Sequence, residues 1–234
     1  FFCLCLCHLC LVFVGMVSME EANKDLEEEQ NDDVETIKTA ALLVRQRRFK
    51  IITVLFLYIL GYSIIVPLFP RLYIIAAEGD RAQASYVSGL VSGIGSVVQF
   101  LALPVLSALS DVFGKKSVLL LSLSFGCFLY LFLMASIDSL LSVSLANVLS
   151  GLTFVNIPVC NAALAETTRP GESAAHAFGL VTAAFGLCLV VGPLLGSYLG
   201  DRNPHYACAA GLVPTLLAVA FLLLCDWGGA AQAA

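Results

Sequence analysis

Six long apolar stretches follow one another along the chain after residue 49. They run over residues 51–69, 86–109, 117–135, 140–164, 175–199 and 207–225. A helix needs about 20 apolar residues to cross about 30 Å of hydrocarbon, so each stretch is long enough to span a bilayer. None shows the alternation of apolar and polar residues that a membrane β-barrel requires. The pattern predicts six transmembrane helices, because a backbone in lipid must satisfy its hydrogen bonds internally.

Most charged residues lie at the breaks between these stretches, at residues 71–81, 111–116, 138, 166–172 and 201–205. A charge at the centre of a bilayer costs about 2.5–3.5 kcal/mol, so the breaks mark the water boundaries. Charged residues make up 12% of the 234 residues, whereas soluble domains carry about 25%. The chain is therefore expected to be an all-α membrane protein, a bundle of six transmembrane helices.

Lysine and arginine are distributed unequally between the two sides of the predicted bundle. One side has the basic segment RQRRFK at residues 45–50, together with Lys115, Lys116 and Arg169. The other side has only Arg71, Arg81 and Arg202. Basic residues concentrate on the cytoplasmic side of membrane proteins, which places the N-terminal tail and the even-numbered turns in the cytosol. This pattern names no particular membrane.

The segments outside the six helices differ in composition. Residues 1–18 are apolar and rich in cysteine, and Met19 opens the acidic segment that follows. We interpret residues 1–18 as an upstream extension from the gene model, with an additional helix or anchor as the alternative. We expect residues 19–49 to form an acidic and then basic cytosolic tail, residues 50–225 the six-helix domain, and residues 226–234 the truncated start of a central linker. The cysteines between Cys3 and Cys10 fit a greasy terminal segment better than a metal or acyl site.

The break at residues 107–118 has the sequence SALSDVFGKKSV. Glycine permits a sharp turn, aspartate can accept hydrogen bonds from free amides at a helix N-terminus, and the lysines suit an anionic inner leaflet. This stretch resembles the loop motif of the major facilitator superfamily, which runs Gly-x-Leu-Ala/Ser-Asp-Arg-x-Gly-Arg/Lys-Arg/Lys between the second and third helices. The matching residues are Leu109, Ser110, Asp111, Gly114, Lys115 and Lys116, while Ser107 and Val112 depart from the motif. The resemblance implies that these matching residues form a gating loop.

The fifth apolar stretch contains CLVVGPLLGS at residues 188–197. It resembles the antiporter pattern Gly-x-x-x-Gly-Pro-x-x-Gly-Gly of the same superfamily, matched by Gly192, Pro193 and Gly196. Small residues let two helices approach closely, and a proline frees a carbonyl and permits a bend. The alternative interpretation is a helix-packing seam with no meaning for transport.

Two further segments resemble drug/proton antiporters of the tetracycline-resistance type. They are GYSIIVPLFPRL at residues 61–72 and ALAETTRPGESAAHAFG at residues 163–179. The resemblance covers about residues 50–225 and implies the N-terminal six-helix half of a twelve-helix major facilitator fold. In that family, two halves rock around a central site and expose it alternately to each side of the membrane.

The resemblance implies that helices one, two, four and five line the solute cavity or its gates. The best candidates are Tyr62, Gln99, Asn147 and Asn156. A buried amide needs hydrogen-bond partners, so these groups are expected to face helices or water rather than lipid. Hydrogen bonding between helices, without a role in solute binding, is the alternative for each residue.

Asn147 stands where the antiporter pattern has an arginine, and no Asp, Glu, Lys or Arg lies deep in the six stretches. Proton coupling needs a titratable group, and His176 near the inner end of helix five is the remaining candidate. Coupling is therefore expected to reside in the other half of the transporter. Facilitated diffusion is the alternative.

The expected function is transport of a small solute by alternating access, as an antiporter-like protein or a facilitator. The expected partners are the solute, the lipid bilayer, and either a C-terminal six-helix half or a second copy of the chain. A six-helix protein acting as a dimer and a non-transporting scaffold or adaptor are the alternatives. No nucleophile–base set, metal-ligand spacing, phosphate loop or basic stripe is present in the sequence. We therefore expect no enzyme activity, cofactor, metal or nucleic acid.

Overall fold

A computed structural model describes residues 34–167 and 174–224, and the side chains from residue 44 on, except 174–177. Six of its helical stretches are long and apolar enough to cross a membrane, which confirms the expected spans. They are Val44–Ala76, Arg81–Phe113, Lys115–Ala135, Leu140–Ala165, Phe178–Arg202 and Pro204–Leu224. The extension at residues 1–18 with its cysteine cluster, the acidic part of the tail and the linker at residues 226–234 lie outside the described residues.

The first span is bent where prolines interrupt it. Helix α2 (Val34–Ile65) is followed by the short 3₁₀ helix η1 (Val66–Leu68) and by α3 (Phe69–Ala76). Pro67 and Pro70 lie at the starts of η1 and α3, where the missing amide costs no intrahelical hydrogen bond. Helix α2 already begins at Val34, so it extends well into the segment that the sequence pattern places before the first span.

Five further helical elements form the second, third and fourth spans. The second span is α4 (Arg81–Phe113) and the third is α5 (Lys115–Ala135). The fourth span consists of α6 (Leu140–Ser150), the 3₁₀ segment η2 (Gly151–Val155) and α7 (Asn156–Ala165). A 3₁₀ segment within a membrane helix weakens the regular hydrogen-bond ladder, and such segments often mark a hinge.

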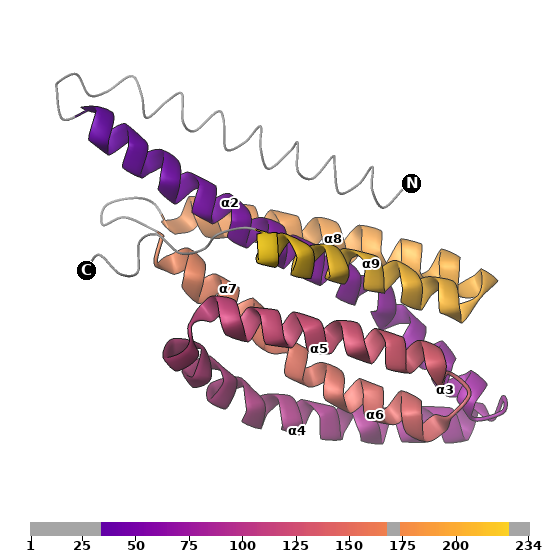
Figure 1. Cartoon of the computed structure of the whole chain (residues 1–234). Helices are drawn as coiled ribbons and strands as arrows, with labels where there is room; N and C mark the ends of the chain where they lie inside the picture. The colour runs from indigo at the N-terminus through magenta and orange to yellow at the C-terminus, as the bar shows by residue number, and fades with distance from the viewer. Residues whose placement is uncertain (1–33, 168–173, 225–234) are drawn as a thin grey trace.

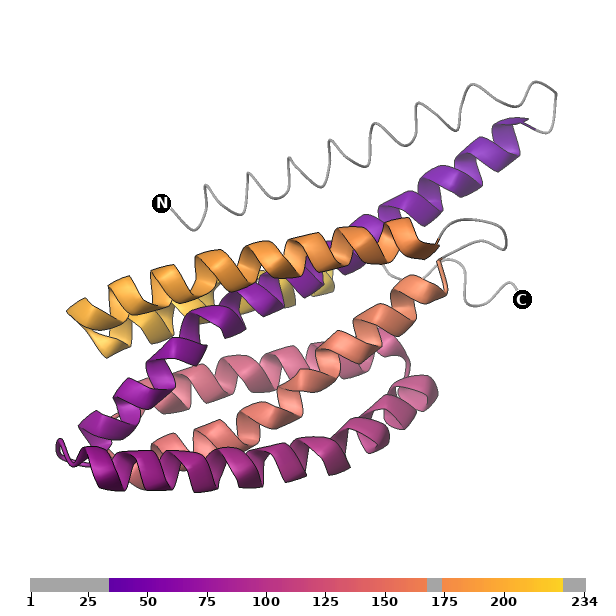
Figure 2. The same cartoon turned by 180° about the vertical axis from the view of Figure 1, so that it is seen from behind.

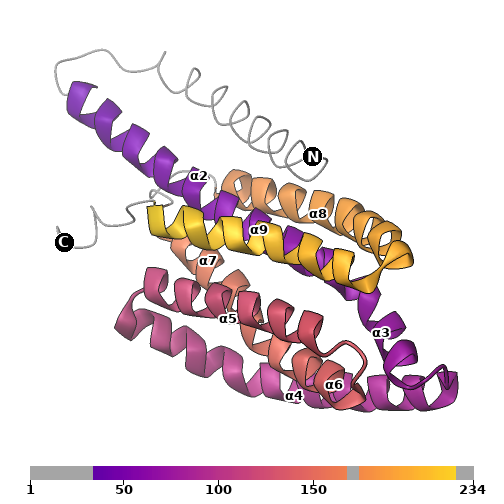
Figure 3. The same ribbon diagram turned by 45° about the vertical axis from the view of Figure 1, so that its right-hand side comes forward.

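The last two spans are α8 (Ala174–Arg202) and α9 (Pro204–Leu224). They pack beside α2, whereas α4, α5, α6 and α7 form a second group of helices, as Figures 1 and 3 show. Contacts between α5 and α9 join the two groups. Seen from behind in Figure 2, α2 crosses between α8 and the fourth span.

Burial differs sharply among the spans. In the most apolar window of each span, 83% of the residues are buried in the first span, against 6% in α4 and 17% in α8. Helix α2 is thus the centre of the bundle. Two glycines of α4, Gly89 and Gly93, and two of α8, Gly179 and Gly186, face open space with no atom within 4 Å of an added Cβ. The faces of α4 and α8 that carry these glycines are uncovered.

Candidate functional site

The turn between α4 and α5 is formed by a single glycine. Gly114 has φ +87° and ψ 141°, a conformation that residues with a Cβ rarely adopt. Gly114 ends α4 and serves as the N-cap of α5, with no side-chain cap hydrogen bond. Asp111 lies in the last turn of α4 and is exposed, so it does not cap the start of α5. Of the other motif residues, Ser110 is buried and Leu109 is exposed.

The end of the fourth span holds two basic segments together. Lys115 forms an ion pair with Glu166, the residue that follows α7. Arg48 of α2 donates through Nε to Oγ1 of Thr167, at 3.2 Å, and through a terminal nitrogen to the Thr167 carbonyl, at 2.8 Å. Thr167 is buried. The start of α2, the α4–α5 turn and the end of α7 are therefore tied at one end of the bundle, on the left in Figure 1.

The Arg48–Thr167 hydrogen bonds and the Lys115–Glu166 ion pair should contribute differently to the free energy of unfolding. Arg48→Met removes charge-assisted hydrogen bonds to a buried residue and should lower the free energy of unfolding by about 1.5–3 kcal/mol. Glu166→Gln removes an ion pair whose acid is 54% exposed, and it should cost less than about 1 kcal/mol. Thermal unfolding of the purified variants in detergent measures both. Equal losses for the two variants would contradict this ranking.

The motif in helix five lies directly against α2. A Cβ added to Gly192 would lie 2.6 Å from the Cβ of Ser63, and one added to Gly196 would lie 3.0 Å from the carbonyl carbon of Ile64. The hydroxyl of Ser63 donates to the carbonyl of Cys188 at 3.0 Å. Pro193 lies inside α8, between the two glycines. These glycines let α8 approach α2 to backbone contact.

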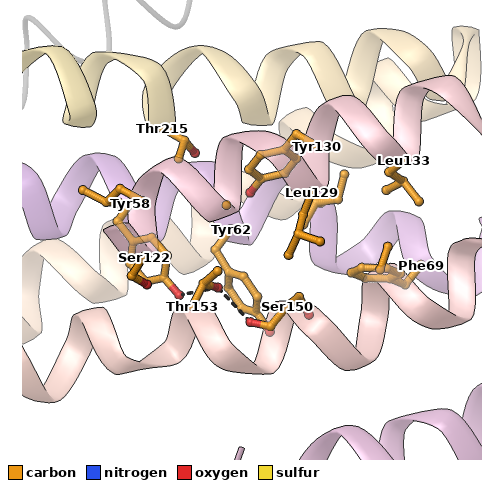
Figure 4. A pocket seen from close by; sticks show the side chains of 14 residues that line it. Tyr58, Tyr62, Phe69, Ser122, Leu129, Tyr130, Leu133, Ser150, Thr153 and Thr215 are labelled. Carbon is orange, nitrogen blue, oxygen red and sulfur yellow. Dashed lines mark hydrogen bonds between the residues drawn. The ribbon is translucent and has the colours of Figure 1, made fainter. Parts of the chain in front are cut away.

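A small cavity lies inside the bundle, between α2, α5, the fourth span and α9. Figure 4 shows its lining, which combines aromatic and aliphatic groups with several hydroxyls. The hydroxyls of Tyr58 and Thr153 lie 3.3 Å apart and share a hydrogen bond. The ring of Tyr62 stacks on Tyr58 and meets Phe154 edge-on, with centroids 4.9 Å apart in the second pair.

The structure places the four candidate cavity residues in different surroundings. Tyr62 lines the cavity, whereas Gln99, Asn147 and Asn156 do not. Gln99 packs against Gly151 of η2, and Asn147 donates to the hydroxyl of Tyr73 at 3.1 Å. Asn156 is 1% exposed, and neither polar atom of its side chain has a hydrogen-bond partner. The four residues therefore do not form one site within this bundle.

Six cavity residues on α5 had not been expected. Three of them, Ser122, Gly126 and Tyr130, recur every four residues and so share one face of the helix. That spacing is visible in the sequence and could have pointed to them. Thr215 of α9 completes the wall from the opposite side, as Figure 4 shows.

The cavity is too small for an organic solute. Its volume is about 40 Å³, whereas sites for small molecules usually enclose about 300–1,000 Å³. A volume of this order accommodates only a few water molecules. This cavity is therefore not a site for an organic solute.

Comparison with known families decides the identity of this six-helix bundle. The model of the Major Facilitator Superfamily matches residues 51–228, which include the first span from residue 51 on and the whole of the other five. The chain belongs to this superfamily. The match extends over the Gly114 turn, the α2–α8 contact and the broken fourth span.

Tetracycline resistance proteins are identical to this chain at about a third of the aligned positions. The chain is 34% identical to the class C tetracycline resistance protein of Escherichia coli over 145 residues, or 62% of this chain and 36% of that protein. It is 33% identical to the class B protein of Escherichia coli over 171 residues, or 72% of this chain and 40% of that protein. The chain thus spans less than half the length of these superfamily relatives.

A solved superfamily structure has the same fold. The crystal structure of the human organic anion transporter MFSD10 (TETRAN) aligns with 76% of this chain and 46% of that protein, with a TM-score of 0.65 and 22% identity. At this identity the likeness concerns the fold alone. The six spans of this chain therefore share the fold of part of that protein.

Proposed function

We propose that this chain is one six-helix half of a secondary transporter, which moves a small solute across a membrane by alternating access. The observation that carries the proposal is the superfamily match over all six spans, at less than half the length of the relatives. The interior supports it, because the cavity of about 40 Å³ admits no organic solute. The solute path then runs between this half and another one.

The uncovered faces of α4 and α8 suit such a second half. Gly89 and Gly93 on α4 and Gly179 and Gly186 on α8 are open to any partner helix. Small residues on a membrane helix allow close packing of another helix. We propose a C-terminal six-helix half as the occupant, by analogy with the two-half architecture of the superfamily. A second copy of the chain would use the same faces.

The positions of the charged residues favour facilitated diffusion, or proton coupling through a group in the other half. Among the described residues, ionisable acids and bases lie near the ends of the spans, as in the pairs Lys115–Glu166 and Arg71–Asp201. Asn147, at the position of the antiporter arginine, is a neutral amide bonded to Tyr73. His176 lies in the first turn of α8, near one end of that span. This half then supplies solute contacts, and the second half any proton-coupling group.

A reconstitution experiment tests the proposed transport. The protein encoded by the longest transcript is purified and inserted into proteoliposomes, and uptake of small organic solutes is measured, with tetracycline as the first probe because of the named relatives. Saturable uptake that requires the protein supports a transporter. A correctly folded protein that neither binds nor moves any solute of the panel contradicts it and favours a scaffold or adaptor.

We also propose that the end of the bundle carrying Lys115 and Lys116 faces the cytosol, because basic residues concentrate there. A single cysteine replacing Lys116 should react with a membrane-impermeant thiol reagent only after the cells are permeabilised. A cysteine replacing Asp138, in the exposed turn between α5 and α6 at the other end, should react in intact cells. Both variants are made in a background without the native cysteines. The reverse labelling pattern would overturn the proposed orientation.

A further inference from the structure

The fourth span is overwound near its middle. Its 3₁₀ segment η2 has five residues, Gly151–Val155, whereas 3₁₀ runs longer than three or four residues are uncommon. Pro158 in α7 has no amide to bond to the carbonyl of Phe154, as a regular α-helix requires. The hydroxyls of Ser150 and Thr153 donate to carbonyls three residues earlier in the chain, each at 2.7 Å. Local hydrogen bonding and the missing amide therefore both favour the overwound form.

Asn156, the first residue after η2, has unfavourable surroundings. Its side chain is 1% exposed, and neither of its polar atoms has a hydrogen-bond partner among the described residues. Both atoms are covered by protein, so water does not reach them in this arrangement. A buried amide without partners costs free energy. A position of α7 that replaced Asn156 by an apolar residue at this place would remove that cost.

A change of η2 from 3₁₀ helix to α-helix provides such a position. Each residue turns the chain by about 120° in a 3₁₀ helix and by about 100° in an α-helix, with rises of about 2.0 Å and about 1.5 Å. Over the five residues of η2, the difference turns α7 by about 100° relative to α6 and draws it back by about 2.5 Å. Successive residues of an α-helix lie about 100° apart. The change therefore moves α7 by approximately one residue, and Ile157 comes to lie near the place of Asn156.

The sequence of α7 fits both the present register and this shifted register. In the present register the buried residues of α7 are Asn156, Val159, Cys160, Ala163 and Leu164. In the shifted register the same positions are occupied by Ile157, Cys160, Asn161, Leu164 and Ala165. Each set contains one asparagine and four residues with apolar or thiol side chains. Packed helices shift between discrete arrangements rather than deforming continuously, so two registers of similar burial form a two-state element.

The bonds at the C-terminal end of α7 hold the present register. Arg48 of α2 donates to the hydroxyl and the carbonyl of Thr167, and Lys115 of α5 pairs with Glu166. Glu166 and Thr167 follow α7 directly, so a turn of about 100° carries both away from their partners. These two connections, which we call the latch, must open before α7 can change register.

We propose that the fourth span is a two-state switch, in which η2 rewinds into α-helix and α7 moves by one residue when the latch opens. The switch connects the buried middle of the span with Lys115, the first residue of α5, beside the Gly114 turn. Opening of the latch exchanges Asn156 for Ile157 at the buried position. The switch belongs to this half alone and does not rest on the proposed transport.

Two alanines of α7 report the register through opposite changes. Ala163 is 0% exposed, and in the shifted register it takes the place of Ala162, which is exposed. Ala165 is exposed, and it takes the place of Leu164, which is 0% exposed. The test measures the rate at which N-ethylmaleimide labels Ala163→Cys or Ala165→Cys in the purified full chain, in a background without the native cysteines. Cys160, retained alone, is the matched control because its place is buried in both registers.

Two sets of substitutions favour the shifted register by different routes. Pro158→Ala supplies the amide that the carbonyl of Phe154 needs in an α-helix. Arg48→Met combined with Glu166→Gln opens the latch. The two routes are independent of each other, so either one decides the question if the other variant does not fold.

The labelling rates of the two alanine positions should change in opposite directions. Because a buried thiol is labelled in proportion to the population of the register that exposes it, labelling of Ala163→Cys should become about tenfold faster. Labelling of Ala165→Cys should become about fivefold slower, and Cys160 should stay protected. Faster labelling at both positions would show loosening of the helix and would contradict the proposal. Unchanged rates at both positions in a folded variant would also contradict it.

Discussion

Gly192→Ala should lower the melting temperature of the protein by about 5 °C, whereas Gly186→Ala on the same helix should leave it unchanged or raise it. The new methyl group at position 192 would lie 2.6 Å from the Cβ of Ser63 and 2.9 Å from its carbonyl carbon. Non-bonded carbons prefer separations of about 3.5–4.0 Å, so the backbones of α2 and α8 must move apart. Overpacking of this kind costs about 1–3 kcal/mol.

Gly186 is the matched control because it is also a glycine within α8, with open space around an added Cβ. Alanine there gains helix propensity of about 1 kcal/mol over glycine. Cys127, Cys160, Cys188 and Cys208 are buried free thiols, so a thiol-reactive fluorescent dye reports unfolding directly. A melting temperature for Gly192→Ala equal to that of Gly186→Ala would show that α2 and α8 are not in close contact.

Asp111→Asn should reduce the rate of transport about tenfold without lowering the amount of folded protein. The carboxylate is exposed in the last turn of α4, beside the turn that the superfamily resemblance associates with gating. Asparagine keeps the shape of the side chain but removes its charge, and a charge-assisted hydrogen bond from the proposed second half to Asp111 would contribute about 1.5–3 kcal/mol. A tenfold change in rate corresponds to about 1.4 kcal/mol in the barrier. Initial uptake rates in the reconstituted system measure this effect.

Asp138→Asn provides the control for this prediction. Asp138 is an exposed acid in the turn between α5 and α6, at the other end of the bundle. Its neutralisation should leave the uptake rate within a factor of two. If Asp111→Asn and Asp138→Asn transport alike, Asp111 has no gating role. If only expression falls in Asp111→Asn, its role is in assembly.

The positions of the six spans could be predicted because hydrocarbon imposes a length and excludes charge. The same logic does not predict the break in the fourth span. The segment at residues 151–155 is as apolar as its neighbours, so hydropathy does not mark its change to a 3₁₀ helix. This segment packs closely against α4: a Cβ added to Gly151 would lie 3.2 Å from the carbonyl oxygen of Gly95. Likewise the start of α2 at Val34 lies in polar sequence, where hydropathy gives no signal.

The candidate site was less predictable than the fold. Residue type selected Tyr62 as a candidate for the solute cavity, and in the structure Tyr62 lines the small internal cavity, which is too small for an organic solute. It also selected Asn147, whose amide donates a hydrogen bond to the hydroxyl of Tyr73. Which face of a helix a polar side chain occupies depends on the rotation of that helix within the bundle. Hydropathy along a span that is apolar on all sides does not encode this rotation, since lipid and protein interior are equally apolar.

The central place of α2 has a consequence for how the protein is made. Among the six described spans, the one formed by α2 is synthesised first, yet the helices that pack against it most extensively are α9 and α8, the last two of the six. During translation this first helix is therefore in the membrane before α8 and α9, its main neighbours, have been synthesised. Contacts between distant parts of a chain form slowly, so the bundle is completed only after α9 is inserted. Until then the faces of α2 that α8 and α9 cover in the complete bundle are exposed to lipid.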